Sequence, residues 1–181
     1  MKRRSFSTSG IVLAKIDYGE ADRIFFILTS DFGKLPFIAK GIRKPKSKKR
    51  GFLEVFNIVR LEASRGLNLD IITEVEVVRS FSKIRRDLKK MTLAYYFVEV
   101  LLKILPEGEE NNRIFDLAIF YFSQLEKRQD LKVLRQEFVF DILTNLGFWP
   151  KGEKISDFDL VVERVLEKKI NSKRVGSKIL V

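Results

Sequence analysis

The segment best equipped for chemistry is a run of positive charge between residues 40 and 50, called here the basic loop. Its sequence is KGIRKPKSKKR, in which seven of eleven residues are Lys or Arg and none is acidic. Each such side chain can neutralise a phosphate and release a counterion, so the run favours a polyanionic partner. Gly41 and Pro45 argue against regular structure in it. The predicted phosphate contacts are Lys40, Arg43, Lys44, Lys46, Lys48, Lys49 and Arg50.

Three nearby carboxylates, Asp17, Glu20 and Asp22, are the second group with possible chemistry. A metal-dependent nuclease needs such carboxylates to hold its cation. The chain has no His and no second acidic cluster to complete a two-metal site. We therefore prefer a polar turn, with Asp22 paired to Arg23 or to the basic loop.

Composition narrows the function further. The chain has 181 residues, 35 Lys and Arg against 24 Asp and Glu, and a formal net charge of +11, which points to nucleic acid or an anionic membrane. It has no Cys and no His, so disulfides, Cys/His zinc sites, haem ligation by His and serine-type triads are excluded, and no cofactor is expected. No stretch supplies the roughly 18 apolar residues of a membrane span, and residues 5–10 are too polar for a secretory signal.

The basic loop is flanked by segments of strand character. Five short apolar or alternating stretches, separated by turns, predict a small closed or nearly closed barrel, with an SH3-like barrel as the structural alternative. The loop joins the third predicted strand to the fourth. A charge run is often only a solvated loop, but this concentration on a barrel favours contact with nucleic acid. The predicted strands are residues 10–17, 23–29, 35–40, 56–63 and 70–78.

Barrels that bind single strands place aromatic side chains beside a basic groove. Most aromatic residues in short strands belong to the core, so we expect exposure mainly for Phe32, in a turn, and Phe52, just after the basic loop. The barrel half contains Tyr18, Phe25, Phe26, Phe32, Phe37, Phe52 and Phe56.

From Phe81 onward the apolar period changes from two to 3.6, which predicts helices. We expect one helix from an N-cap at Ser82 to Pro106, another over residues 114–125, and a third between Asp130 and Gly147. A fourth, more amphipathic helix is expected over residues 156–169. The predicted fold class is thus α+β, with a barrel domain at 1–80 and an all-α domain at 81–181.

Several stretches carry a more specific pattern. In the barrel half these are SGIVLAKIDYGEADRI, LTSDFGKLPFIAKGIRKPKSKKRG and FNIVRLEASRG. The helical half contributes LAYYFVEVLLKILPEGEENNRIFDL, VLRQEFVFDILTNLGFWP and the closing RVGSKILV. Together they resemble the bacterial RecO family of DNA repair proteins, over about residues 9–150 and again in the last few residues.

The resemblance implies an OB-fold followed by a helical domain and a role in recombinational repair. It implies binding of single- and double-stranded DNA, strand annealing, and cooperation with RecR to load RecA on DNA covered by single-strand-binding protein (SSB), in the bacterial cytoplasm near the nucleoid. It also places a pocket for the acidic SSB tail in the helical domain, for which Arg135 is the rim candidate. Many relatives have a four-cysteine zinc module after the position of Pro150. Here residues 151–158 contain no Cys, so no zinc site is expected, and the chain is shorter than usual after that point.

We therefore expect a DNA-binding mediator rather than an enzyme. Arg23 and Lys34, on strands adjoining the basic loop, are secondary candidates for phosphate contact, and the tail at 168–178 is a second basic surface. Three alternatives stay open: an RNA-binding OB-fold module of the translation machinery, the metal-dependent nuclease, and a peripheral membrane protein using residues 156–169.

Overall fold

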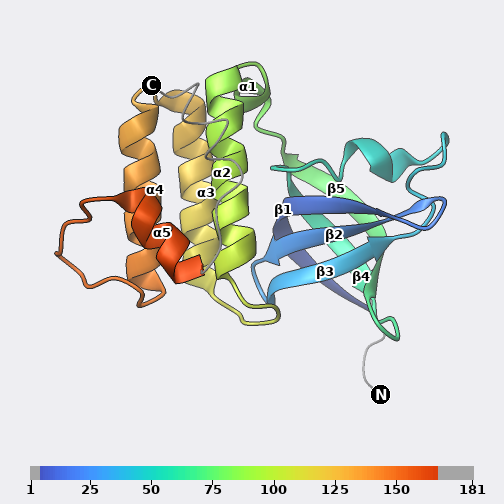
Figure 1. Ribbon diagram of the computed structural model, residues 1–181. Coiled ribbons are helices and arrows are strands. Elements are labelled where there is room, and N and C mark those ends of the chain that lie inside the picture. Colours follow the sequence, from blue (N-terminus) through green and yellow to red (C-terminus); the bar gives the residue numbers. More distant parts are fainter. Residues whose placement is uncertain (1–4, 167–181) are drawn as a thin grey trace. The chain divides into compact units, whose positions relative to one another are not determined.

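The computed structural model describes residues 5–166, which form two compact units (Figure 1). The first unit comprises the chain up to Ser80 together with Leu105–Asn112. The second comprises Phe81–Ile104 and the described residues from Arg113 onward. Among residues 5–166, none of the helices is both long and apolar enough to cross a membrane.

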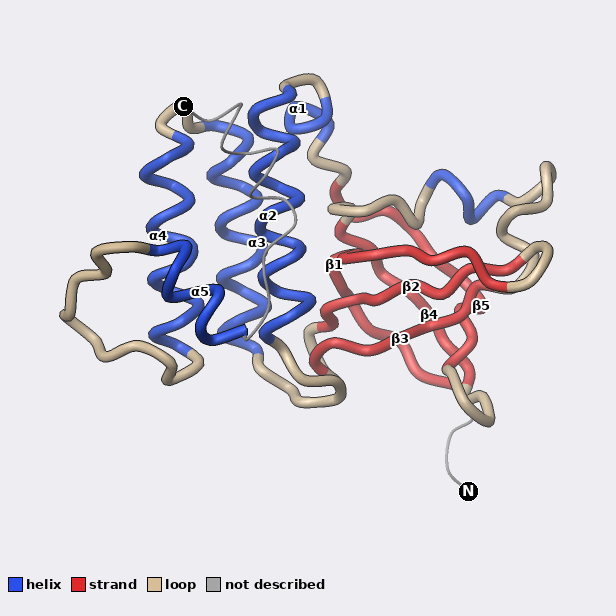
Figure 2. Tube along the Cα trace, viewed as in Figure 1, coloured by secondary structure: helices blue, strands red, loops and turns tan. Residues whose placement is uncertain are grey.

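The first unit is a closed five-stranded barrel, shown in red in Figure 2. Its strands follow the order β1-β2-β3-β5-β4, and all pairs are antiparallel except β3 with β5. A five-stranded barrel of this order is an OB-fold, which confirms the predicted fold class and leaves the SH3-like alternative wrong. The strands are β1 (Ser5–Tyr18), β2 (Asp22–Thr29), β3 (Gly33–Ala39), β4 (Ile58–Ser64) and β5 (Asp70–Arg79).

Strand β1 closes the barrel because it is long enough to pair on both sides. Its first half pairs with β4 and its second half with β2, with a register shift between Val12 and Ala14. Such a shift bends a strand and increases its twist. The polar residues 5–9, which we had expected to precede the strand, belong to it through the pairing with β4.

Alternating apolar residues of all five strands fill the barrel. Phe25 and Phe37 are fully buried in this core, so neither is available to a nucleic acid. Ile42 and Leu53, which lie in the connection between β3 and β4, are also part of it. The complete cluster of buried residues is Val12, Phe25, Ile27, Phe37, Ala39, Ile42, Leu53, Val59, Leu61, Ala63 and Ile72.

The segment Leu105–Asn112, called here the strap, packs against the start of β3. The Gly108 amide donates a hydrogen bond to the Lys34 carbonyl at 3.0 Å, and Glu107 forms an isolated parallel bridge with Lys34. Gly33 adopts a φ of +67°, and a Cβ built on it would lie 1.9 Å from the Glu109 carbonyl oxygen. The strap therefore needs a glycine at position 33.

The second unit consists of helices, shown in blue in Figure 2. The expected single helix from Ser82 is broken, because the Asp87 carboxylate accepts the amides of Lys89 and Lys90 at 2.9 and 3.1 Å and starts a new helix. The N-cap prediction for Ser82 is wrong, since Phe81 occupies that position. The helices are α1 (Ser82–Arg85), α2 (Leu88–Ile104), α3 (Asn112–Lys127), α4 (Leu131–Asn145) and α5 (Phe158–Leu166).

Aromatic rings dominate the core of the helical unit. Phe97 of α2 is fully buried and stacks on Phe138 of α4 with ring centroids 4.0 Å apart. Tyr121 and Phe122 of α3 contact Phe97 edge-on, at 6.1 and 5.9 Å. The two edge-on contacts have a geometry that aromatic quadrupoles favour, and together with the stack they connect three helices at this point.

Candidate nucleic-acid interface

The basic loop connects β3 to β4, at the end of the barrel where the β1–β2 turn also lies (Figure 1). A single turn of 3₁₀ helix, Lys48–Gly51, interrupts it. Its cations face solvent with one exception, because Lys49 is half-buried. The exposed ones are Lys40, Arg43, Lys44, Lys46, Lys48 and Arg50.

The loop is attached to the barrel at both ends. Ile42 is buried in the core near its start, and Leu53 is buried just after its end. The Gly41 amide donates to Asp22 Oδ1 at 2.7 Å. Lys49 Nζ donates to the Ile72 carbonyl of β5 at 2.9 Å. Both ends of the basic loop are therefore anchored to the barrel, and its charged middle projects between them.

Two of the predicted cations are partly neutralised within the barrel. Arg43 donates to the Gly19 carbonyl at 3.2 Å and lies 3.5 Å from Asp17, while Arg23 donates to the same carboxylate. The hydrogen bond from Arg23 holds the pKa of Asp17 below its ordinary value of 3.8, and the charge of Arg43 adds to this effect. Arg23 and Arg43 therefore orient the turn and the loop in addition to carrying charge.

Unlike the exposed cations of the basic loop, Lys34 is buried. Its exposed fraction is 7%, and burial lowers the pKa of its amine from the ordinary 10.5, an effect that nearby Glu107 opposes. A buried amine cannot reach a phosphate without losing its packing. We therefore leave Lys34 out of the interface proposed below.

We expect Lys34→Met to leave DNA affinity within about twofold, because the residue is almost wholly buried. A lysine whose pKa is lowered by folding favours the folded state more as pH rises toward the unfolded value of 10.5. The parent should therefore gain stability over the alkaline pH range just below 10.5, and Lys34→Met should lose that gain. Chemical unfolding at several pH values and a DNA titration check both statements. A large loss of affinity in a stably folded variant would contradict them.

The exposed aromatic residues of the barrel differ in part from those expected. Phe52 is 41% exposed, as predicted, but Phe32 is half-buried and packs edge-on against Phe6 with centroids 5.0 Å apart. The most exposed aromatic residue of the barrel is Tyr18, at 56%. Sequence reasoning did not single it out, although its place directly before the Gly19 turn was a usable signal.

The acidic cluster does not form a metal site. Asp17 contacts two arginines, and Asp22 accepts the Gly41 amide, as expected for a residue paired with the basic loop. Across residues 5–166, no three or more His, Cys, Asp or Glu side chains gather in a way that could hold a metal ion.

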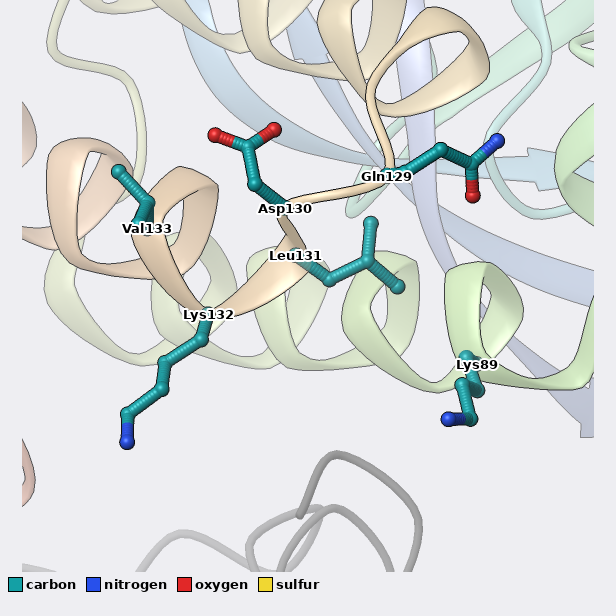
Figure 3. Close-up of a pocket in the computed structure, with 6 residues that line it drawn as sticks. All are labelled: Lys89, Gln129, Asp130, Leu131, Lys132 and Val133. Atoms are coloured by element: carbon teal, nitrogen blue, oxygen red, sulfur yellow. The ribbon is translucent and has the colours of Figure 1, made fainter.

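In the helical unit, Arg135 is already engaged. Its guanidinium forms an ion pair with Asp159 of α5 and lies 4.5 Å from the centre of the Tyr96 ring. A separate pocket of about 240 Å³ opens where α4 begins. Figure 3 shows Leu131 of this pocket between Lys132 and Lys89, with both amines directed away from Asp130. The predicted basic tail at 168–178 lies outside the described residues.

Comparison with known proteins identifies the family. The model "Recombination protein O N terminal" matches residues 1–81, and "Recombination protein O C terminal" matches residues 85–154. The chain belongs to the RecO family. The two RecO models meet where the barrel ends and α1 begins, so the family division agrees with the change of secondary structure.

Relatives named DNA repair protein RecO occur in several bacteria. The chain is 33% identical to that of Dehalococcoides mccartyi over 150 residues, which is 83% of this chain and 59% of the relative. Identity is 31% to that of Pelotomaculum thermopropionicum, with the same coverage, and 41% to that of Rubrobacter xylanophilus over 69% of this chain and 50% of the relative. The chain thus spans about three fifths or less of the length of these relatives.

Proposed function

We propose that this RecO-family chain binds DNA through the basic loop and acts as a recombination mediator rather than an enzyme. The observation that carries the proposal is the set of exposed cations on an OB-fold. In the described part of the chain, five of them have side chains that are not tied to another residue. These five are Lys40, Lys44, Lys46, Lys48 and Arg50.

Contacts of this kind are made with phosphates and carry no sequence information. We infer binding of both single- and double-stranded DNA with little base preference. Two strands repel each other, and a protein that neutralises phosphates on both lowers that repulsion. Strand annealing is the activity we infer from this effect, with the basic residues at 168–178 as the second contact. The RNA-binding alternative rests on the same charges.

We further infer cooperation with RecR and with the acidic tail of SSB, and work near the bacterial nucleoid. Family membership supports these partners. The helical unit supplies two cationic features that suit an acidic peptide, namely Arg135 and the pocket of Lys89 and Lys132.

A salt titration tests the DNA-binding proposal. About five phosphate contacts should reduce the affinity for a short single strand roughly 100-fold between 50 and 200 mM salt. The same protein should accelerate annealing of complementary strands, with and without SSB. If the DNA affinity does not change with salt concentration, the basic loop is not the main contact. RNA that displaces single-stranded DNA of equal length would favour the alternative module.

The ion pair of Arg135 leads to a prediction for the SSB tail. If Arg135 binds the acidic peptide, Asp159 competes with it, so Asp159→Asn should strengthen peptide binding about fivefold, the equivalent of roughly 1 kcal/mol. Arg135→Gln should weaken binding instead. Peptide titrations by fluorescence anisotropy measure both changes, with thermal melts to check folding. If both variants fold and bind the peptide with unchanged affinity, Arg135 is not part of the SSB-tail site. The pocket at Lys132 then remains as the candidate site.

A further inference from the structure

Tyr18 lies next to the residues that hold the start of the basic loop. It is the last residue of β1, and its side chain is 56% exposed. The next residue, Gly19, accepts a hydrogen bond from Arg43 through its carbonyl at 3.2 Å. The residue paired with Tyr18 on the neighbouring strand β2, Asp22, accepts a hydrogen bond from the Gly41 amide at 2.7 Å. The neighbour of Tyr18 along the chain and its neighbour across the sheet therefore both hold the start of the loop.

On β1 itself, the exposed face that carries Tyr18 is apolar. Ile16 lies two residues earlier on β1, so it shares the face of Tyr18, and it is 54% exposed. Its partner across the strands is Ile24. The charged residues Lys15 and Asp17, which alternate with them along β1, are directed to the other face, where Lys15 Nζ lies 2.6 Å from Glu54 Oε2. The end of β1 thus presents Ile16 and Tyr18 on one exposed face, opposite the Asp22 carboxylate that accepts the Gly41 amide, with the cationic loop attached beside it.

This combination suits one kind of ligand. An unpaired base offers a flat π-face that can stack on tyrosine, while its strand offers phosphates to the lysines of the adjoining basic loop. Bases in a duplex stack on one another, so their faces are closed to a side chain. We propose that Tyr18 stacks on an unpaired base of a strand whose phosphates are held by the basic loop, and that it gives the interface a preference for single strands. This inference rests on the proposed DNA binding and specifies its substrate class.

The test uses the full chain, a single-stranded DNA oligomer, a duplex of the same length, and a single strand of the same length that lacks bases. Tyr18→Ala should weaken binding of the base-bearing single strand about 5- to 150-fold, the range for loss of one stacked base. It should leave duplex affinity within about twofold and the salt dependence unchanged, because no charge is removed. Tyr18→Phe should behave like the parent, and Tyr18→Leu, which keeps apolar area without a ring, should not.

The strand without bases tests whether Tyr18 and the bases act through the same interaction. The parent should bind it more weakly than the base-bearing strand, and Tyr18→Ala should cause no further loss on it, as expected when two changes remove the same interaction. The control is Tyr95→Ala, on α2, which removes a tyrosine that is 49% exposed. It should leave all three affinities unchanged.

Failure of the inference and failure of the proposed function give different results. If the parent binds with steep salt dependence but Tyr18→Ala and Tyr18→Leu bind the single strand normally, the stacking role is overturned while the basic loop stands. Equal weakening on single strand and duplex also overturns it. If the parent binds none of the three DNA molecules, the proposed function itself is wrong. Should Tyr18→Ala not fold, the comparison of Tyr18→Leu with Tyr18→Phe decides.

Discussion

Replacing Lys44, Lys46, Lys48 and Arg50 together with glutamine should lower DNA affinity about a thousandfold near physiological salt. Four lost phosphate contacts reduce the salt slope by about 3.6 units on duplex and about 2.8 on a single strand, and the duplex affinity falls by about three quarters of an order of magnitude for each contact under those conditions. Single strand and duplex should both be affected, since phosphates are common to them. Annealing should fail in parallel, because it depends on holding two polyanions close.

The structure decides which cations this variant leaves in place. Lys49 is kept because its amine donates to the Ile72 carbonyl, and Arg43 is kept because it orients the turn at Gly19. Changing either would move the loop as well as remove a charge. The four chosen residues are exposed, so each replacement should alter stability by only about 0.5 kcal/mol.

The matched control removes the same charge elsewhere. Long-range attraction to DNA falls when the net charge of a protein falls, whatever the position of the lost residues. A second variant with four exposed cations of the helical unit changed to glutamine measures that effect alone and should lose much less affinity. If the loop variant melts like the parent and binds and anneals like it, the loop is only a connector. The control positions are Lys127, Lys151, Lys154 and Arg164.

The barrel was predictable because its signals are local. Alternation along a strand reports which side is buried, and Val59, Leu61 and Ala63 lie in the core as that pattern indicates. The basic loop was predictable for a similar reason, since charge without alternation and with Gly and Pro indicates exposed irregular structure. The long extension of β1 was not, because residues 5–9 are polar and become strand only through their pairing with β4.

Features of the site that depend on contacts distant in sequence were not predictable. Lys34 looks like any basic residue after a turn, yet it is buried and forms a bridge with Glu107 of the strap, far along the chain. One local contact was missed as well: the long helix begins at Asp87 rather than Ser82, because the amides of Lys89 and Lys90 converge on the Asp87 carboxylate. Tyr18 and Phe32 both stand beside turns, and only the packing of Phe32 on Phe6 separates them.

The packing of the strap against β3 can be tested by substituting Gly33. Of the variants proposed here, this one should lose the most stability. Gly33→Ala should lower the free energy of unfolding by about 3 kcal/mol or more. The backbone conformation at φ +67° accounts for about 1 kcal/mol of this, because a side chain there is strained. The remainder comes from the new Cβ, which would lie 1.9 Å from the Glu109 carbonyl oxygen and must push the strap backbone aside.

Gly19→Ala separates these two contributions. Gly19 has a similar φ of +56°, but a Cβ there meets no atom within 4 Å, so only the backbone strain of about 1 kcal/mol should appear. Urea unfolding of both variants, followed by a signal from the barrel, gives the difference directly. A Gly33→Ala variant that loses no more stability than Gly19→Ala would mean that the strap does not press on β3 in solution. A much larger loss at position 33 would show that the strap is part of the barrel's folded structure, although it follows the first long helix in the chain.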